Sequence, residues 1–319
     1  MNLALYILLF AIGLVLIIKG SDWFVDSTIW IATALGIPQF IIGATLVSIC
    51  TTLPELLVST GAAMNGDTSM ALGNAIGSVG CNTGLILGVV IFFSTPVLYH
   101  RNALRIKSTF ISLALVLYFA IGLLTGSFNY FTGIVFLLFA AGFIYYNYTE
   151  ARKYKVDKQA SVTVDTGRKA VVKNTGLFLL GLALTIAGAN LMIIYGEKIA
   201  LSLNVPSIVI GVTMTALGTS LPELVTAITS LRKKASSLSI GNIFGANILN
   251  LTLVLGSTSI IKAVPMDDLK LYFHIPAILL ITLVASVPTL LLKKKYPRIM
   301  GAMLILSYLT YISLSIFIR

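Results

Sequence analysis

Two glutamates directly follow prolines inside long apolar stretches, in the segments TTLPE at 51–55 and TSLPE at 219–223. A charged side chain in such surroundings is costly, so Glu55 and Glu223 are the first candidates for a functional role. Proline removes a helical hydrogen bond and crowds the preceding turn, so backbone carbonyls around Thr51 and Thr219 are expected to be free. Hydroxyl oxygens lie one turn ahead of each carboxylate, on Thr51, Thr52, Thr219 and Ser220.

Oxygen is the only kind of ligand atom that the two segments offer. Carboxylate, carbonyl, amide and hydroxyl oxygens suit Ca²⁺ or Na⁺, whereas Mg²⁺ dehydrates reluctantly and zinc or copper prefer sulfur and nitrogen. Downstream, Asn74, Ser78 and Asn82 recur at four-residue spacing on one helical face, as do Asn242 and Asn250. The pattern predicts a hard-cation site built by both segments, although interhelical hydrogen bonding is an equally good interpretation for Asn74 and Asn242.

The elements that carry these residues are membrane spans. The chain is 57% hydrophobic and only 10% charged, whereas about a quarter of the residues in a soluble domain are charged. Apolar runs of about 20 residues are long enough to cross a bilayer. We therefore expect an all-α membrane protein with ten transmembrane helices, near residues 3–19, 37–64, 69–95, 108–125, 130–148, 175–195, 206–230, 237–261, 271–292 and 299–318.

The chain is an internal repeat. At a constant offset of 168 residues and without a gap, residues 20–88 overlie 188–256, and the matches include polar residues that chance does not produce in apolar sequence. Each half holds five spans, an odd number, so the second copy enters the membrane in the opposite orientation, as in the inverted repeats of secondary transporters. The expected organisation is a first repeat at 1–148, a loop at 149–174 and a second repeat at 175–319.

The net charge of +11 invites a nucleic-acid interpretation, but the charges sort by side of the membrane. If the 149–174 loop is cytoplasmic, then of 22 Lys and Arg only Lys198, Lys262, Lys270 and Arg319 lie outside, as the positive-inside rule demands. We expect a multi-pass protein of the plasma membrane with both termini outside. The acidic residues other than Glu55 and Glu223 are expected in loops or near span ends. The lipid bilayer is the expected partner, with neither nucleic acid nor an obligate protein partner.

Two carboxylates held together repel each other. An empty cation cage formed by both glutamates is therefore costly to close off from water, whereas a cage that holds cations closes more easily. This favours obligatory exchange by alternating access over uniport. A cation channel is a distant alternative, because channel filters surround an axis along the membrane normal. His100 and His274 lie near span ends and no nucleotide motif is present, so we expect no enzyme activity and no cofactor beyond the transported ions.

With both repeat motifs in register, the chain resembles the sodium/calcium exchangers of the cation/calcium antiporter superfamily. The resemblance implies exchange of Ca²⁺ for Na⁺, with Glu55, Glu223 and the carbonyls of Thr51 and Thr219 as Ca²⁺ ligands. It also implies that spans one and six slide as a gate against the other eight. Further residues are expected in Na⁺ sites or flanking the centre: Ser48, Thr52, Ser78, Asn82, Ala216, Ser220, Asn247 and Asn250.

The sequence departs from the family pattern at three positions. Cys50 stands where a glycine is usual, and Ala246 stands where the second repeat often has a serine, matching Ser78 in the first. The missing hydroxyl implies an absent, weaker or differently built Na⁺ site. Asn250 occupies a position that is acidic in some relatives, notably those that co-transport K⁺. The neutral side chain here argues against K⁺ dependence. Ca²⁺/H⁺ members carry a glutamate shortly after the Gly-Asn pair, which Gly73-Asn74 lacks, so proton exchange takes second place behind Na⁺ exchange and remains the alternative.

Overall fold

Helices form nearly all of the computed structural model, which describes residues 3–94, 101–156, 164–203, 218–267, 270–291 and 296–317. The first half contains α1 (Leu3–Leu35), α2 (Gln39–Ile42), η1 (Gly43–Val47), α3 (Ser48–Thr51), α4 (Leu53–Met64), α5 (Thr68–Gly80), η2 (Cys81–Ile86), α6 (Leu87–Ser94), α7 (Arg101–Thr125) and α8 (Tyr130–Val156). The second half contains α9 (Arg168–Ser202), α11 (Leu221–Arg232), α12 (Ser236–Leu249), η3 (Asn250–Val254), α13 (Leu255–Ile261), η4 (Lys270–His274), α14 (Ile275–Leu291) and α15 (Arg298–Phe317). Segments marked η are π-helical, and two short strands, β1 (Ser127–Phe128) and β2 (Val264–Pro265), pair antiparallel.

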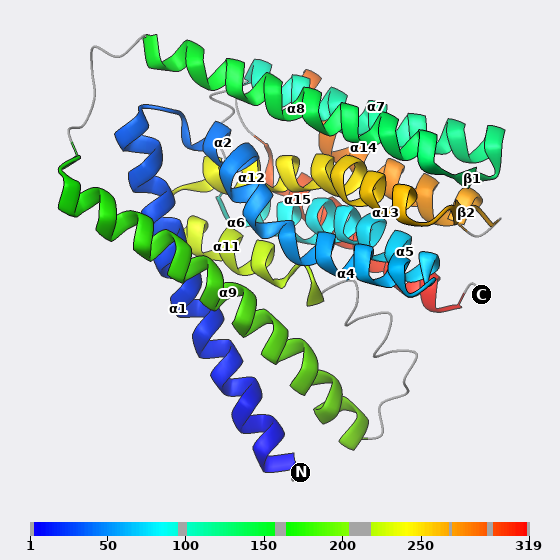
Figure 1. Ribbon diagram of the computed structural model, residues 1–319, viewed down its shortest axis with the longest axis horizontal. Coiled ribbons are helices and arrows are strands. Elements are labelled where there is room, and N and C mark those ends of the chain that lie inside the picture. The colour runs from blue at the N-terminus through cyan, green and yellow to red at the C-terminus, as the bar shows by residue number, and fades with distance from the viewer. Residues whose placement is uncertain are drawn as a thin grey trace.

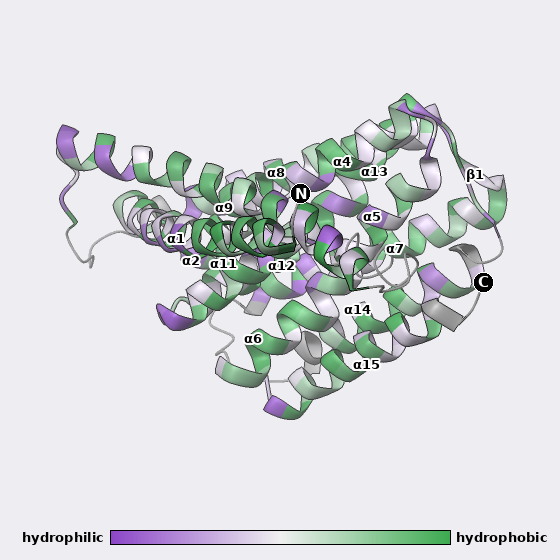
Figure 2. Ribbon diagram, turned by 90° about the horizontal axis from the view of Figure 1, so that it is seen from below, coloured by the Kyte–Doolittle hydropathy of each residue, from purple (hydrophilic) through white to green (hydrophobic). Residues whose placement is uncertain are grey.

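Eight helical runs in the described residues are long and apolar enough to cross a membrane. They coincide with eight of the ten predicted spans, so the prediction of an all-α membrane protein is confirmed. The predicted span at 206–230 overlaps residues 204–217, which lie outside the described residues, and the one at 271–292 contains a shorter apolar helix, Tyr272–Ser286. Hydrophobic residues predominate along α6, α14 and α15 in Figure 2, as expected of helices that cross a membrane.

The first span is longer than the sequence predicted. Helix α1 runs for 33 residues to Leu35, so Asp22 and Asp26 lie inside a helix rather than in a loop. Lys233, just after α11, forms ion pairs with both aspartates, and its Nζ lies 2.8 Å from Asp26 and 3.7 Å from Asp22. The acidic pair is tolerated within the helix because a basic side chain from the second half lies against it.

Both neighbouring helices extend into the segment predicted as a loop at 149–174, because α8 continues to Val156 and α9 begins at Arg168. Residues 157–163 lie outside the described part of the chain. Near the end of α8, Glu150 pairs with Lys107 of α7 at 3.1 Å. Lys107, which the sequence placed in a loop, is fully buried over the Phe40 ring, because the ion pair and the aromatic face together replace water around its charge.

Helices α1 and α9 pack against each other as an antiparallel pair at the edge of the molecule (Figure 1). Glycines permit the close approach: a Cβ on Gly13 would lie 2.9 Å from the Gly188 carbonyl oxygen, and one on Gly20 would lie 2.7 Å from that of Gly181. The same glycines correspond in the repeat, Gly13 with Gly181 and Gly20 with Gly188, at the 168-residue offset. Each half therefore presents an equivalent surface to the other.

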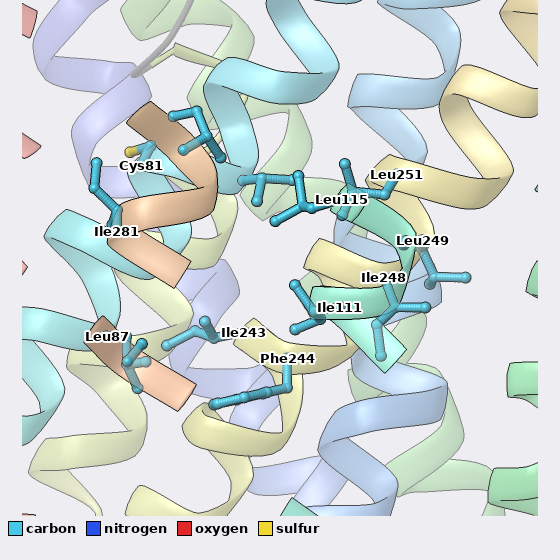
Figure 3. Close-up of a cluster of buried hydrophobic side chains, with 14 of the residues drawn as sticks. Cys81, Leu87, Ile111, Leu115, Ile243, Phe244, Ile248, Leu249, Leu251 and Ile281 are labelled. Atoms are coloured by element: carbon cyan, nitrogen blue, oxygen red, sulfur yellow. The ribbon is translucent and has the colours of Figure 1, made fainter. Parts of the chain in front are cut away.

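The core is centred on α12. Figure 3 shows Ile243, Phe244 and Ile248 of this helix among side chains from η2, α6, α7, η3 and α14. The α12 backbone also meets the α2–η1 segment at Gly241 and Gly43. A Cβ on Gly241 would collide with the Phe40 carbonyl, and one on Gly43 with the Leu238 carbonyl. The two halves thus meet backbone to backbone beside the segments that carry the candidate ligands.

Candidate cation site

The two glutamates occupy equivalent places at the start of two helices. Glu55 is the third residue of α4 and Glu223 the third residue of α11, each just after a proline in the first turn. Proline suits this position because the first backbone N–H groups of a helix have no partner within the helix. The helix dipole places partial positive charge beside each carboxylate. Both side chains are 0% exposed, so the site is removed from water.

The backbone breaks ahead of Glu55 as the proline predicts. Helical hydrogen bonding reaches Thr52 N–H, which donates to the Ser48 carbonyl at 3.0 Å, and resumes where Leu56 N–H donates to the Thr52 carbonyl at 3.0 Å. Between them Pro54 has no N–H, so the Cys50 carbonyl loses its usual helical partner. In the second half, Leu224 N–H donates to the Ser220 carbonyl at 3.0 Å in the same way.

The carboxylates have no hydrogen-bond partner within the described part of the chain, on any of their four oxygens. Glu55 and Glu223 are close enough to interact electrostatically, and the Thr51 side chain neighbours the Glu223 carboxylate. Leaving one buried charge uncompensated costs about 3–5 kcal/mol, and a second like charge adds repulsion. When both groups are ionised, the pair therefore requires bound positive charge.

Two threonines bond to asparagines of the opposite half. The Thr51 hydroxyl donates to Asn242 Oδ1 at 3.2 Å, and the Thr219 hydroxyl donates to Asn74 Oδ1 at 2.9 Å. These two bonds are equivalent under the 168-residue offset. Ser78, from the first half, lies 3.3 Å from the Thr219 hydroxyl. Of the predicted ligands, Ser78 and Thr219 are therefore in contact across the halves, and Thr51 lies beside the Glu223 carboxylate.

Two of the predicted flanking amides lie on π-helical segments. Asn82 is in η2 and Asn250 opens η3, both are 0% exposed, and neither amide group has a hydrogen-bond partner among the described residues. Asn247 instead donates from Nδ2 to the Thr83 hydroxyl of the first half at 2.7 Å. Single π-helical turns are frequent at functional sites. Asn82 and Asn250 therefore remain candidate ligands, whereas Asn247 also ties the two halves together.

The remaining predicted residues fall into three groups. Thr52 and Ser220 are buried with hydroxyls that have no partner in the described ranges, and the Cys81 thiol lies beside Ser220. Ser48 donates to the Thr45 carbonyl of the preceding η1 segment at 3.0 Å and packs against α12 at Gly245. Ala216 lies outside the described residues.

Two contributors were not found from the sequence. The Ser59 hydroxyl accepts a hydrogen bond from Asn74 Nδ2 at 2.9 Å, and the Thr83 hydroxyl accepts one from Asn247 Nδ2. Ser59 lies four residues after Glu55 on one helical face, which is the signal that could have identified it. Thr83 directly follows Asn82 but has no polar counterpart in the second half, where Leu251 stands.

The donor set fits a hard cation that serves as cargo. Among the described residues no group of three or more His, Cys, Asp and Glu side chains is gathered as a metal site. The two carboxylates must therefore be completed by hydroxyl, amide and backbone carbonyl oxygens, which suits Ca²⁺ and Na⁺.

Comparison with known proteins agrees with this geometry. The profile of the family described as sodium/calcium exchanger protein matches residues 5–149 and 173–317. The chain belongs to this family. Similar proteins include an uncharacterized membrane protein of Methanocaldococcus jannaschii, 32% identical over 277 residues that cover 87% of this chain and 89% of the relative. The sodium/calcium exchanger MaX1 of Methanosarcina acetivorans is 28% identical over 312 residues, which cover 87% of this chain and 89% of MaX1.

Solved structures of the sodium-calcium exchanger NCX_Mj share the fold. One of them, from a crystal soaked with Na⁺ and Sr²⁺, aligns with a TM-score of 0.85 at 28% identity. The alignment covers 98% of this chain and 99% of the NCX_Mj chain. Membership of the sodium/calcium exchanger family confirms the predicted class, a Ca²⁺/Na⁺ antiporter and not an enzyme. It does not favour the alternative of proton exchange.

Proposed function

We propose that Glu55 and Glu223 form one central Ca²⁺ site, completed by Thr51 and Thr219, through which this exchanger moves Ca²⁺ against Na⁺. The observation that carries the proposal is the pair of fully buried carboxylates, without hydrogen-bond partners among the described residues, flanked by equivalent threonine–asparagine bonds. One Ca²⁺ compensates the two charges, as do several Na⁺. Because the uncompensated cage resists closure, the protein changes sides only when loaded, which couples the two fluxes.

The Na⁺ sites are proposed around this centre, at Ser48, Thr52, Ser78, Asn82, Ala216, Ser220, Asn247 and Asn250. Burial of Thr52, Ser220, Asn82 and Asn250 without partners in the described residues supports their inclusion. The contact between Ser78 and Thr219 supports a position close to the Ca²⁺ ligands. Na⁺ and Ca²⁺ would then compete for overlapping sets of oxygens.

The proposed architecture is two inverted repeats of five spans, at 1–148 and 175–319, joined by a cytoplasmic segment at 149–174. Two equivalent contacts support it, because Gly88 lies against Gly301 and Gly133 lies against Gly256. Gly88 corresponds to Gly256 and Gly133 to Gly301 at the 168-residue offset, so each contact is the other with the halves exchanged. The antiparallel α1–α9 pair has the same property. The proposed location is the plasma membrane with both termini outside, in keeping with the distribution of Lys and Arg.

The test is uptake of radiolabelled Ca²⁺ into proteoliposomes loaded with Na⁺, with choline, or with an acid interior, at matched external pH. Uptake that requires internal Na⁺ supports Na⁺/Ca²⁺ exchange. Uptake driven only by the acid interior would contradict it and would indicate proton exchange. Uptake that needs no counter-ion gradient would indicate a channel.

Replacing Ala246 by serine is expected to strengthen competition by Na⁺. Ala246 is fully buried on α12 and occupies the place that corresponds to Ser78, whose hydroxyl lies 3.3 Å from Thr219. An added hydroxyl supplies the oxygen that the second repeat lacks. We expect the Na⁺ concentration that halves Ca²⁺ uptake to fall about threefold, the scale of one modest hydrogen-bond-like contact.

The matched control is Ala114→Ser, the same change at a buried position in the apolar cluster of α7. It should leave Na⁺ competition unchanged even if it lowers stability. An unchanged Na⁺ dependence in Ala246→Ser would mean that another ligand already fills this place.

A further inference from the structure

A cavity lies between the end of α6 and the turn that joins α11 to α12. Its volume is about 480 Å³, within the range of about 300–1,000 Å³ that small-molecule sites occupy. Two helical runs long enough to cross a membrane have an end here, since one finishes at Ser94 and another begins at Ser236. The cavity therefore lies near the boundary between the hydrocarbon and the headgroups of a bilayer. Its lining residues are Phe93, Ser94, Leu231, Arg232, Lys234 and Ser236.

Two unpaired positive charges mark the polar side of the cavity. Arg232 and Lys234 are both exposed, and neither forms an ion pair within the described part of the chain. Lys233, which stands between them, is paired instead with Asp22 and Asp26. The charges of Arg232 and Lys234 are therefore available to a negatively charged ligand.

Lys234 has a backbone conformation that does not suit a lysine. Its φ is 57°, in the left-handed region, and it alone has a positive φ among the described residues other than glycine. At the 168-residue offset the first repeat has Gly66, with a φ of 86°. Glycine adopts this conformation without strain, whereas the Cβ of any other residue is crowded. Strained residues gather at ligand sites, so the lysine is a candidate binding group.

The start of α12 lacks the negative charge that its counterpart has. In the first repeat the Asp67 carboxylate caps α5 and accepts a hydrogen bond from the Met70 N–H at 2.9 Å. The corresponding residue is Ala235, and no side chain caps α12. The positive end of the α12 dipole therefore stands beside Arg232 and Lys234 without an anion. Where the first repeat has its own carboxylate, the second has basic groups around a cavity.

The other side of the cavity is apolar. Phe93, near the end of α6, is 69% exposed, and Leu231 of α11 is half-buried. Ile228 lies three residues before Leu231 on the same helical face and is 41% exposed. An inorganic anion gains nothing from such a wall, whereas an acyl chain is removed from water by it. The cavity therefore fits an amphiphilic anion.

We propose that this cavity binds the headgroup phosphate of an anionic phospholipid. Arg232, Lys234 and the start of α12 hold the phosphate. An acyl chain lies along Phe93 and Leu231. Basic pockets between membrane helices bind headgroups in this way. The turn that the lipid covers joins two helices of the candidate cation site, α11 and α12, so the bound lipid stabilises their arrangement at the membrane surface.

The test is titration of the purified protein in neutral detergent with phosphatidylglycerol, read as the mole fraction of lipid that half-saturates the rise in unfolding temperature. Lys234→Gly restores the glycine of the first repeat, so without lipid it should be at least as stable as the wild type. Lys234→Gly and Arg232→Gln should each raise the half-saturating fraction about tenfold, because each removes a charge-assisted bond to phosphate. Unchanged binding in both variants would overturn the proposal.

Lys173→Gln on α9 is the matched control, since it removes an exposed positive charge that does not line the cavity. At about 0.15 M salt its effect should stay below about twofold, because distant surface charges are screened. A loss equal to that of Lys234→Gly would indicate general attraction to charged micelles and would overturn the site.

Two further probes separate the charge of the lipid from its acyl chain. Phosphatidylcholine has the chains without a net charge, and inorganic phosphate at matched ionic strength has the charge without the chains. Neither should raise the unfolding temperature as phosphatidylglycerol does. Equal stabilisation by inorganic phosphate would contradict a lipid as the ligand, and equal stabilisation by phosphatidylcholine would contradict the role of the two basic residues.

Discussion

Glu223→Gln is expected to abolish Ca²⁺ transport, and Glu55→Gln to do the same. Each change keeps the shape of the side chain and removes one of the two charges that face the proposed ion. Both glutamates are 0% exposed, so their charges act without screening by water, and the loss should reach at least about two orders of magnitude. The measurement is Na⁺-driven uptake of radiolabelled Ca²⁺ into proteoliposomes, with the amount of folded protein checked by size-exclusion chromatography.

Folding should survive these changes, because each removes a buried charge that has no hydrogen-bond partner among the described residues. The unfolding temperature in detergent without Ca²⁺ should therefore equal or exceed that of the wild type. Glu197→Gln on α9 is the matched control, since it is the same change on an exposed side chain, and it should transport normally. Retained Ca²⁺ exchange in both cage variants would show that the glutamates are not the ligands.

The sequence alone was sufficient to single out the candidate ligands along the chain. Glu55 and Glu223 each follow a proline, and the structure places both in the first turn of a buried helix. The offset of 168 residues also paired Asn82 with Asn250, and both fall in π-helical segments. These features are local motifs or internal repeats, so they can be recognised from the sequence without knowing which residues are in contact.

The contacts between the halves could not be predicted in the same way. An offset tells which residues correspond, but in a two-fold arrangement the residues that touch are unlike ones, as Thr51 touches Asn242 and Thr219 touches Asn74. The interpretation of both asparagines was therefore left open between a ligand role and interhelical hydrogen bonding.

Long-range compensation of charge was equally hidden. Lys107 was expected in a loop because it is basic, yet it is fully buried, paired with Glu150 and covered by an aromatic ring. The aspartates of α1 were expected outside the helix because they are acidic, yet Lys233 of the second half lies against them. Local hydropathy cannot detect a partner that is distant in sequence, so it ended the first span too early.

Gly241→Ala is expected to disrupt the joint between the halves, with a larger effect on folding than any ligand substitution. The new Cβ would collide with the Phe40 carbonyl and would crowd the Ala44 backbone nitrogen, and these are backbone atoms that cannot rotate away. Overpacking of this kind destabilises by about 3 kcal/mol when the neighbours cannot move. We expect a clearly lower unfolding temperature in detergent, together with loss of Ca²⁺ exchange, because α12 carries Asn242 against Thr51.

Gly142→Ala on α8 is the control for Gly241→Ala. Gly142 is exposed and a Cβ there meets no described atom within 4 Å, so alanine should raise the helix propensity by about 1 kcal/mol without a clash. Stability and exchange should then equal or exceed those of the wild type. If Gly241→Ala were as stable as Gly142→Ala, the two halves would have room to separate at α12 without losing the fold. Exchange that also persisted would mean that the cage does not depend on this backbone contact.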